Sequence, residues 1–207
     1  MSNVTVITHP LVQQSLTRLR DKRTRPQEFR RSLDEIASLM VYEATRSLPV
    51  REIVVETPLE STRGWQLEQE IVLVPILRAG LGMLASILEL VPNARVGFIG
   101  LKREETTLRA HAYHQSLPPN LGNFEIIVID PMLATGGSAV AALDMLVEQG
   151  ARHLRLVNLL AAPEGIHLVE KHHPGVPIFT AAIDRQLNER GYILPGLGDA
   201  GDRLFGT

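Results

Sequence analysis

A short segment between an apolar run and a helical pattern holds the residues best suited to chemistry. Residues 126–138 read IIVIDPMLATGGS, so that one acid, Asp130, follows the apolar run and a Thr-Gly-Gly-Ser turn follows the acid. Adjacent glycines let a ligand approach the backbone, and the hydroxyls and first helical amides of such a turn converge on an anion. The segment lacks the Gly-Lys-Ser/Thr ending of nucleoside triphosphate loops. It predicts a site for a monophosphate-like group beside a carboxylate that binds sugar hydroxyls; the alternative is an ordinary tight turn into a capped helix.

A second candidate is Arg78, which follows the buried run IVLVPIL at residues 71–77. Ala79 and Gly80 come next, and these small residues would let a diphosphate approach the backbone. A guanidinium group matches phosphate oxygens in a two-pronged geometry. The pattern indicates an anion site at Arg78, although a lone arginine is more often solvated or paired with a carboxylate.

The third candidate is YILPGLGDAGDR at residues 192–203, which is too rich in glycine for a core strand. Its flexible backbone would approach a flat ligand closely. A polar tail that merely caps the domain would have the same composition. The segment is therefore a candidate binding loop with an open alternative.

Other patterns point to different chemistry and are weaker. Residues 80–85 fit the G-x-G-x-x-A dinucleotide fingerprint, but Arg78 precedes them and the next strand ends without the acid that binds ribose. Residues 196–201 fit G-x-G-x-x-G, with too few residues after them for a βαβ unit. The histidines that stand in pairs have no partner at a metal-ligand spacing and are interpreted as surface residues: His111, His114, His172 and His173.

These candidates need a scaffold that brings them together, and from residue 71 onward apolar runs alternate with helical patterns. Such alternation predicts an α/β fold, a parallel sheet with helices on both faces. In open parallel sheets a ligand binds beyond the carboxyl ends of the strands, so we expect the loops after Leu77, Gly100, Ile129 and Ile183 to share one rim. The expected strands are 71–77, 96–100, 125–130, 154–160 and 177–183, and the expected helices follow Gly82 and span 139–149.

The first 70 residues predict a helix and a hairpin. Apolar residues at helical spacing run from Pro26 to Leu48. Residues 51–57 and 65–68 predict two short strands, with ESTRG at residues 60–64 as the tip of a hairpin that suits a subunit contact. No repeat or linker divides the chain, so we expect a single domain over residues 1–207. It would comprise an appendage at 1–70, an α/β core at 71–185 and a binding loop at 186–207.

Composition excludes several classes of protein. The 207 residues are 44% apolar and 21% charged, close to globular averages, and the formal net charge is −2. This charge gives no general attraction to nucleic acid or to an anionic membrane, so neither is expected as a partner. The chain has no cysteine and no export or membrane-spanning pattern, which fits a cytoplasmic protein. We interpret the basic run RLRDKRTR at residues 18–25 as a solvated face.

Through its strand, acid and ATGGS loop the chain resembles the type I phosphoribosyltransferases. The form with a single acid, DPMLATGGS at residues 130–138, is similar to the uracil-specific members of that family. Further motifs resemble those members in the same order: HPL at 9–11, YEAT at 42–45, VPILRAGLGM at 74–83, RVGFIGLKRE at 95–104 and GYILPGLGDAGDR at 191–203. The likeness covers essentially the whole chain, and it departs from the family's usual LYRDEET at Lys102 and Glu104.

The resemblance implies a type I phosphoribosyltransferase-like parallel sheet flanked by helices, with a hairpin arm and a C-terminal hood that binds the base. It implies transfer of the phosphoribosyl group of 5-phospho-α-D-ribose 1-diphosphate to uracil, with catalytic roles for Asp130, Arg78 and Asp199. The residues implied to bind the phosphoribosyl diphosphate are Arg78, Arg103, Asp130, Pro131, Met132, Leu133, Ala134, Thr135, Gly136, Gly137, Ser138 and Asp199. Those implied to bind uracil, whose carbonyls and N3–H complement backbone groups, are Ile193, Gly198, Asp199 and Ala200.

The resemblance also implies partners. It implies Mg²⁺ bound mainly through the substrate diphosphate, without assigned protein ligands, and a homodimer or larger homo-oligomer. Some members are activated by GTP, and no residues of this chain can be assigned to that effector. A competing hypothesis is a pyrimidine-responsive RNA-binding regulator on the same fold, which the near-neutral charge and the lack of a dense basic stripe disfavour. A nicotinamide-dependent dehydrogenase is the other alternative, and it rests only on residues 80–85.

Overall fold

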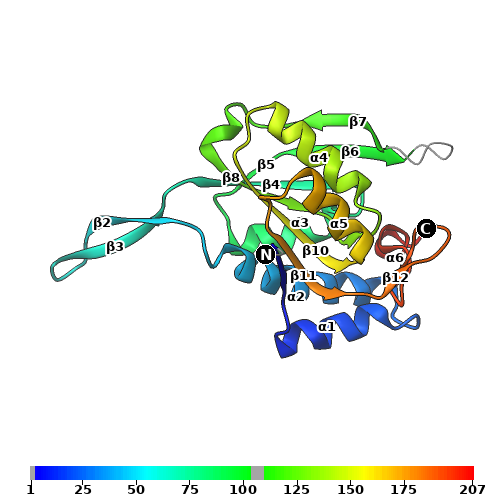
Figure 1. The fold of residues 1–207 in the computed structure, drawn as a ribbon. Coiled ribbons are helices and arrows are strands. Elements are labelled where there is room, and N and C mark those ends of the chain that lie inside the picture. Colours follow the sequence, from blue (N-terminus) through cyan, green and yellow to red (C-terminus); the bar gives the residue numbers. More distant parts are fainter. Residues whose placement is uncertain (1–2, 104–109) are drawn as a thin grey trace.

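The structure, a computed structural model, describes residues 3–103 and 110–207. Its centre is a 9-stranded sheet whose main strands follow the order β1-β11-β10-β8-β4-β6-β7 (Figure 1). Neighbours in this order are parallel, except that β6 and β7 are antiparallel. The main strands are β1 (Val4–Val6), β4 (Glu70–Leu77), β6 (Phe98–Arg103), β7 (Ala110–Ser116), β8 (Phe124–Ile129), β10 (His153–Ala161) and β11 (Ile178–Ile183). Short strands β5 (Arg95–Val96) and β9 (Met132–Leu133) pair with β4 and β10.

The central strands are buried on both faces, and their residues alternate between two apolar clusters. In β4, Ile71 and Leu73 belong to one cluster, whereas Val72 and Val74 belong to the other. The helices of the first cluster are α1 (Pro10–Arg20), α2 (Pro26–Thr45), α3 (Leu81–Leu90) and the short α6 (Ala200–Phe205), and those of the second are α4 (Gly137–Glu148) and α5 (Pro163–His172). Helices therefore cover both faces, and the predicted α/β architecture is confirmed.

The predicted strands are confirmed with shifts at their ends. β6 continues to Arg103 instead of ending at Gly100, because its last residues pair with the antiparallel β7. The sequence of β7, AHAYHQS, lacks the apolar alternation of a half-buried strand, so sequence reasoning missed it. Residues 186–207 are not one loop: they form the short strands β12 (Gln186–Leu187) and β13 (Ile193–Leu194) and then the helix α6 (Ala200–Phe205).

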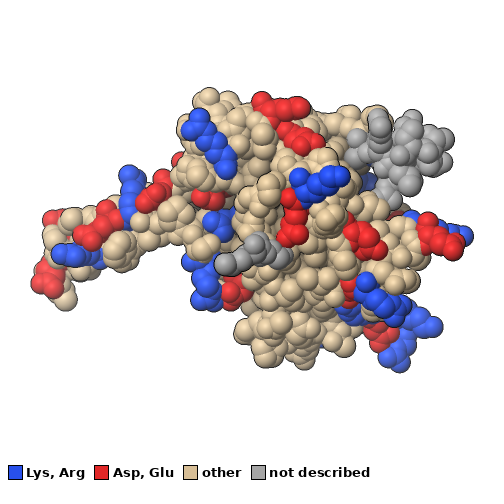
Figure 2. Space-filling model, viewed as in Figure 1, with Lys and Arg blue, Asp and Glu red and all other residues tan. Residues whose placement is uncertain are grey.

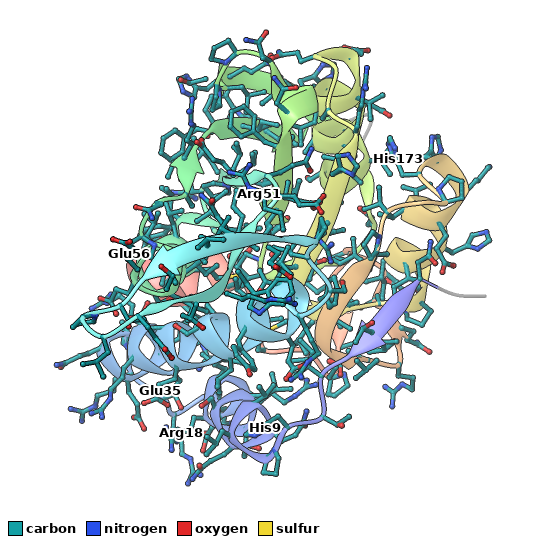
Figure 3. All side chains as sticks on the ribbon, turned by 90° about the vertical axis from the view of Figure 1, so that its left-hand side faces the viewer. His9, Arg18, Glu35, Arg51, Glu56 and His173 are labelled. Atoms are coloured by element: carbon teal, nitrogen blue, oxygen red, sulfur yellow. The ribbon has the colours of Figure 1, made fainter. Side chains whose placement is uncertain are left out.

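The interpretation of residues 18–25 as a solvated face is wrong for its first arginines. Sequence reasoning missed α1, whose polar residues hide the core-facing Val12, Leu16 and Leu19. The run begins in the last turn of this helix, where Arg18 donates to Glu35 of α2 at 2.9 Å (Figure 3). Arg20 pairs with Asp184, beyond β11, at 2.6 Å. These arginines therefore tie α1 to the rest of the domain.

The hairpin of residues 50–67 projects from the body as an arm (Figure 1). β2 (Val50–Glu56) pairs with β3 (Ser61–Leu67), and the turn is closed where Thr57 N–H donates to Glu60 O at 3.0 Å. The predicted tip at residues 60–64 is wrong, because Ser61–Gly64 belong to β3. Both faces of the arm are largely exposed, so a strand there carries the polar residues that otherwise mark a turn. By contrast, α1 and α2 of the same N-terminal region pack in the main core.

Gly80 and Gly82, at the start of α3, allow close packing. A Cβ at Gly80 would lie 2.5 Å from Ile129 O and 2.8 Å from Ile76 O. A Cβ at Gly82 would lie 2.5 Å from Leu204 Cδ2 of α6. The contacts of the helix with β4, β8 and α6 explain both glycines, so the pattern at residues 80–85 needs no dinucleotide.

We expect Gly80→Ala to lower the free energy of unfolding by about 1–3 kcal/mol, because the new methyl group would meet backbone oxygens at the ends of two central strands. Gly175→Ala is the matched control, since a Cβ there has no atom within 4 Å. Urea denaturation of both variants measures the difference. Equal stability of the two variants would contradict the close approach.

Candidate active site

Three loops meet at one edge of the sheet. The residues that directly follow β4, β8 and β11 are Arg78, Asp130 and Asp184. Because parallel strands run in one direction, their carboxyl ends share an edge. The structure thus brings the loops after Leu77, Ile129 and Ile183 to the common rim that the sequence predicts.

A pocket of about 360 Å³ opens at this edge. Its wall comes from Ala79 beside Arg78, from the segment after β8 and from the C-terminal segment. The lining residues are Ala79, Asp130, Met132, Ala134, Arg190, Gly191, Tyr192, Ile193, Gly198, Asp199, Ala200 and Gly201. The pocket therefore joins Asp130 to all the residues that the resemblance links to uracil.

A smaller hollow of about 50 Å³ lies in the predicted phosphate loop. Its lining residues are Asp130, Met132, Leu133, Ala134, Thr135, Gly136, Ser138 and Ala139. Three of them also line the larger pocket: Asp130, Met132 and Ala134. The two spaces adjoin, so a ligand could fill both.

The phosphate loop ends at the N-terminus of α4, whose positive end has no acidic residue in its first turn. Gly136, the N-cap, has φ +83°, and a Cβ there would lie 2.8 Å from Gly165 O. Backbone conformation and packing therefore both require glycine at 136. A Cβ at Gly137 would meet only Thr135 Oγ1, at 3.7 Å. Since packing does not require Gly137, this glycine leaves space beside the amides that would bind an anion.

Asp130 has little compensation for its charge. Its carboxylate accepts one long hydrogen bond, from Met132 N–H at 3.4 Å, and burial raises the pKa of Asp130 to about 7. The buried Asn158 of β10 donates to the backbone carbonyl of Asp130 at 2.6 Å and holds the residue in place. An acid that is hard to ionise without a ligand is typical of a functional position.

Of the two arginines predicted to bind the diphosphate, the side chain of Arg78 is described and that of Arg103 is not. Arg78 is exposed, lies 6.0 Å from the Phe205 ring and has no carboxylate at ion-pair distance within the described residues. The Arg103 backbone ends β6, next to β4, but its side chain and Glu104 lie outside the described part of the chain. Lys102 is exposed on β6. Arg78 therefore places an accessible guanidinium group at the rim.

The C-terminal segment presents backbone groups to the pocket. Ile193 is buried in β13, and Asp199 is the N-cap of α6, where its Oδ1 accepts Asp202 N–H at 2.9 Å. Gly198 has φ +82°, and in the described part of the chain neither its N–H nor its C=O has a hydrogen-bond partner. This arrangement offers one donor and one acceptor to a flat ligand.

Sequence reasoning missed Asp184 and Arg20. Burial alone would raise the pKa of Asp184, but hydrogen bonds from Arg20 and Gly196 N–H together hold that pKa below its usual value. One signal was present, because Asp184 follows the apolar run IFTAAI just as Asp130 follows IIVI. The pairing with Arg20 has no local signal, since 164 positions separate the two residues.

Lys and Arg residues are interspersed with Asp and Glu on the face shown in Figure 2. Within residues 3–103 and 110–207, no group of three or more His, Cys, Asp or Glu side chains could hold a metal ion. His173 bonds to Asp144 at 2.9 Å. None of the described helices is long and apolar enough to cross a membrane.

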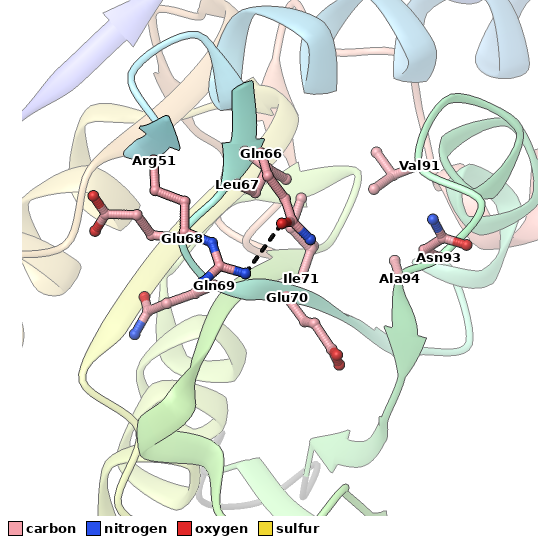
Figure 4. A pocket seen from close by; sticks show the side chains of 10 residues that line it. All are labelled: Arg51, Gln66, Leu67, Glu68, Gln69, Glu70, Ile71, Val91, Asn93 and Ala94. Carbon is pink, nitrogen blue, oxygen red and sulfur yellow. Dashed lines mark hydrogen bonds between the residues drawn. The ribbon is translucent and has the colours of Figure 1, made fainter. Parts of the chain in front are cut away.

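Another hollow, of about 350 Å³, lies at the base of the arm (Figure 4). Its residues come from β2, β3, the start of β4 and the loop after α3, and Arg51 donates to Gln66 Oε1 at 3.0 Å. None of the residues predicted to bind substrate lines it. It is separate from the pocket at the sheet edge.

Known structures share this fold. The chain is similar to a solved Aquifex aeolicus protein, with a TM-score of 0.93 and 41% identity over 99% of this chain and 98% of that one. A hypoxanthine-guanine phosphoribosyltransferase from Bacillus anthracis has a TM-score of 0.54 at 15% identity, covering 77% of this chain and 80% of that one. The chain thus has the fold of the type I phosphoribosyltransferases.

Sequence comparison narrows the class. The family model "Uracil phosphoribosyltransferase" matches residues 6–207. A uracil phosphoribosyltransferase from Symbiobacterium thermophilum is 56% identical over 100% of both chains, and one from Dictyoglomus turgidum is 54% identical over 99% of both. The chain belongs to the uracil phosphoribosyltransferase family.

We expect Asp130→Asn to raise the free energy of unfolding of the ligand-free protein at pH 8 and to leave it nearly unchanged at pH 4. The carboxyl ionises near pH 3.8 in the unfolded chain and about 7 in the folded one. Between these values the folded state binds more protons, so stability falls as the pH rises, and asparagine removes that loss.

Urea unfolding between pH 4 and pH 8 measures the effect. Glu148→Gln, an exposed carboxyl-to-amide change on α4, is the control and should show no comparable trend. A gain in Asp130→Asn that does not grow with pH would contradict the raised pKa.

Proposed function

We propose that the chain transfers the phosphoribosyl group of 5-phospho-α-D-ribose 1-diphosphate to uracil at the pocket on the carboxyl edge of the sheet. Uracil N1 bonds to the ribose C1, the bond from C1 to the diphosphate oxygen breaks, and the N1 proton passes to solvent or to a carboxylate. The products are UMP and pyrophosphate. The observation that carries this assignment is the pair of adjoining spaces at the sheet edge: Asp130 and the C-terminal segment line one, and Asp130 and the phosphate loop line the other.

The phosphoribosyl end would lie in the loop after β8. The amides and hydroxyls of Thr135–Ser138 would bind the 5′-phosphate at the N-terminus of α4, with the backbone of residues 131–134 around the sugar. Asp130 would accept hydrogen bonds from the ribose hydroxyls, which lower the pKa of an acid that stands at about 7 without ligand. The ionised carboxylate would then favour the positive charge that develops at C1.

The diphosphate would lie against Arg78 and Arg103, whose guanidinium groups neutralise the leaving group. A Mg²⁺ ion would be held mainly by diphosphate oxygens, and Asp199, which lines the pocket and uses only Oδ1 in its bond to Asp202 N–H, could add a carboxylate oxygen. The ion would neutralise part of the negative charge of the diphosphate.

Uracil would lie against Ile193 and residues 198–200. The unpartnered N–H and C=O of Gly198 complement a uracil carbonyl and N3–H, whereas cytosine would place its amino group and unprotonated N3 against the same groups. Asp199 would stand between the base and the diphosphate, since it lines the pocket beside Gly198. Backbone recognition of this kind favours uracil over the other bases.

We also propose that the protein is a homodimer or larger homo-oligomer in the cytoplasm, with the arm as a contact. The arm exposes large apolar side chains: Val54 is 76% exposed, Leu59 95% and Trp65 66%. Isolated exposed residues are common, but their concentration on one projecting hairpin favours a protein partner. A GTP effector remains an implication of the resemblance, with no residues assigned.

We expect pyrophosphate release from phosphoribosyl diphosphate and Mg²⁺ with uracil, and none with cytosine, adenine or hypoxanthine, because only uracil matches the backbone groups of the C-terminal segment. A coupled pyrophosphate assay measures the release, and chromatography identifies UMP. Release with another base alone would retain the phosphate loop and overturn the base assignment. No release with any base would overturn the proposed reaction.

We expect Gly137→Val to raise the KM for phosphoribosyl diphosphate by about tenfold or more, because its side chain would occupy space beside the amides that bind the 5′-phosphate. The melting temperature should change little, since packing leaves this position open. Gly175→Val, at another open glycine, is the control. An unchanged KM in a folded Gly137→Val variant would exclude Gly137 from the phosphate site.

A further inference from the structure

We propose that Arg20 and Asp184 form a clamp that positions the backbone of the uracil-binding segment, and so act as positioning residues for base affinity and base choice. This inference rests on the proposed function. Neither residue lines the pocket, and nothing in the proposed reaction uses the charge of Asp184.

The clamp holds both hydrogen-bonding groups of one residue, Gly196. The Asp184 Oδ2 atom accepts Gly196 N–H at 2.8 Å, and the Arg20 Nη1 atom donates to Gly196 O at 2.9 Å. The two side chains join each other through paired hydrogen bonds of 2.8 and 2.6 Å. This closed network is shielded from solvent, because only 5% of the Asp184 side chain and 26% of the Arg20 side chain are exposed.

Gly196 lies between the two parts of the segment that would contact uracil. It has φ +62°, and a Cβ there would lie 2.2 Å from Ile193 O, so the chain folds back tightly on Ile193. Gly198, two residues later, carries the unpartnered N–H and C=O. A shift of Gly196 would therefore move both parts of the base site together.

A second arginine, Arg203, hydrogen-bonds the carbonyl of the next residue, Leu197, and links it to α1. Arg203 of α6 donates to Leu197 O at 2.9 Å, and it also donates to Leu19 O and Asp21 O at the end of α1. Its guanidinium lies 4.5 Å from the ring of Phe29 on α2. The carbonyls of residues 196 and 197 are thus both occupied by arginine side chains.

The clamp therefore preorganises the backbone donor and acceptor that would bind the base. A flexible glycine-rich segment would lose conformational entropy on binding, whereas a clamped one has its donor and acceptor in place beforehand. The phosphate loop packs elsewhere: Gly136 approaches Gly165 closely, and the loop leads directly into α4. Loss of the clamp should therefore weaken contacts to the base and spare contacts to the ribose phosphate.

The test needs a variant that folds. Removal of one partner alone would leave a buried charge unpaired, whereas replacement of both by apolar residues of similar size is often close to neutral for stability. The variant is therefore the double change Arg20→Met/Asp184→Leu, with its melting temperature measured. Arg18→Met is the matched control, because Arg18 lies on the same helix and pairs with Glu35 instead of the segment.

The readouts separate base from ribose phosphate. We expect the double variant to raise the KM for uracil by about tenfold or more, with the KM for phosphoribosyl diphosphate within about twofold of wild type. Calorimetry should show weaker UMP binding and unchanged ribose 5-phosphate binding. Arg18→Met should match wild type in every measurement.

Two results would overturn the clamp. One is an unchanged uracil KM and UMP affinity in the folded double variant; the other is an equal loss of UMP and ribose 5-phosphate binding, which would indicate a general structural role. The proposed function is tested separately by the wild-type chain. If wild type forms UMP from uracil and the variant behaves like it, only the clamp fails; if wild type forms no UMP, the proposed function itself fails.

Discussion

The shared direction of the parallel strands is the constraint on which the site depends. β4, β8 and β11 are neighbours or near neighbours in one sheet, so the residues that follow them emerge at the same edge. Helices cover both faces, which leaves this edge as the opening where a carboxylate and a glycine-rich segment line one pocket, with Ala79, the neighbour of the exposed Arg78, in its wall. The sheet and the helices packed on both its faces position the residues at that edge.

Several charged groups at the edge have few partners of opposite charge in the ligand-free protein. Their charges together indicate the kind of ligand that would bind. Arg78 has no carboxylate partner among the described residues, the N-terminus of α4 has no acid in its first turn, and Asp130 has a pKa of about 7 because burial disfavours its charge. The segments after β4 and β8 thus offer two positive groups and one carboxylate, which would suit the proposed sugar with its phosphate and diphosphate. The raised pKa lowers folding stability at neutral pH, and a bound sugar would recover that loss.

Much of this site was predictable because its signals are local. A strand, an acid, a turn and a helix N-terminus lie within residues 126–138, and the apolar runs of the central strands need no long-range information. Predictions failed where structure depends on contacts elsewhere. β7 is a strand because it pairs with β6, and residues 61–64 belong to β3 because they pair with β2, although their composition resembles a turn.

By itself, the sequence determined the α/β alternation, the phosphate loop with Asp130 and the family to which these motifs point, because each of these depends on residues close together along the chain. Only the tertiary structure decided how the glycine-rich C-terminal segment is held. In the sequence, Arg20 is one member of a basic run and Asp184 is one acid after a strand. They form an ion pair, with Asp184 buried and Arg20 partly buried, only because α1 packs beside the end of β11. A contact across 164 positions has no periodicity or spacing that a linear pattern can show.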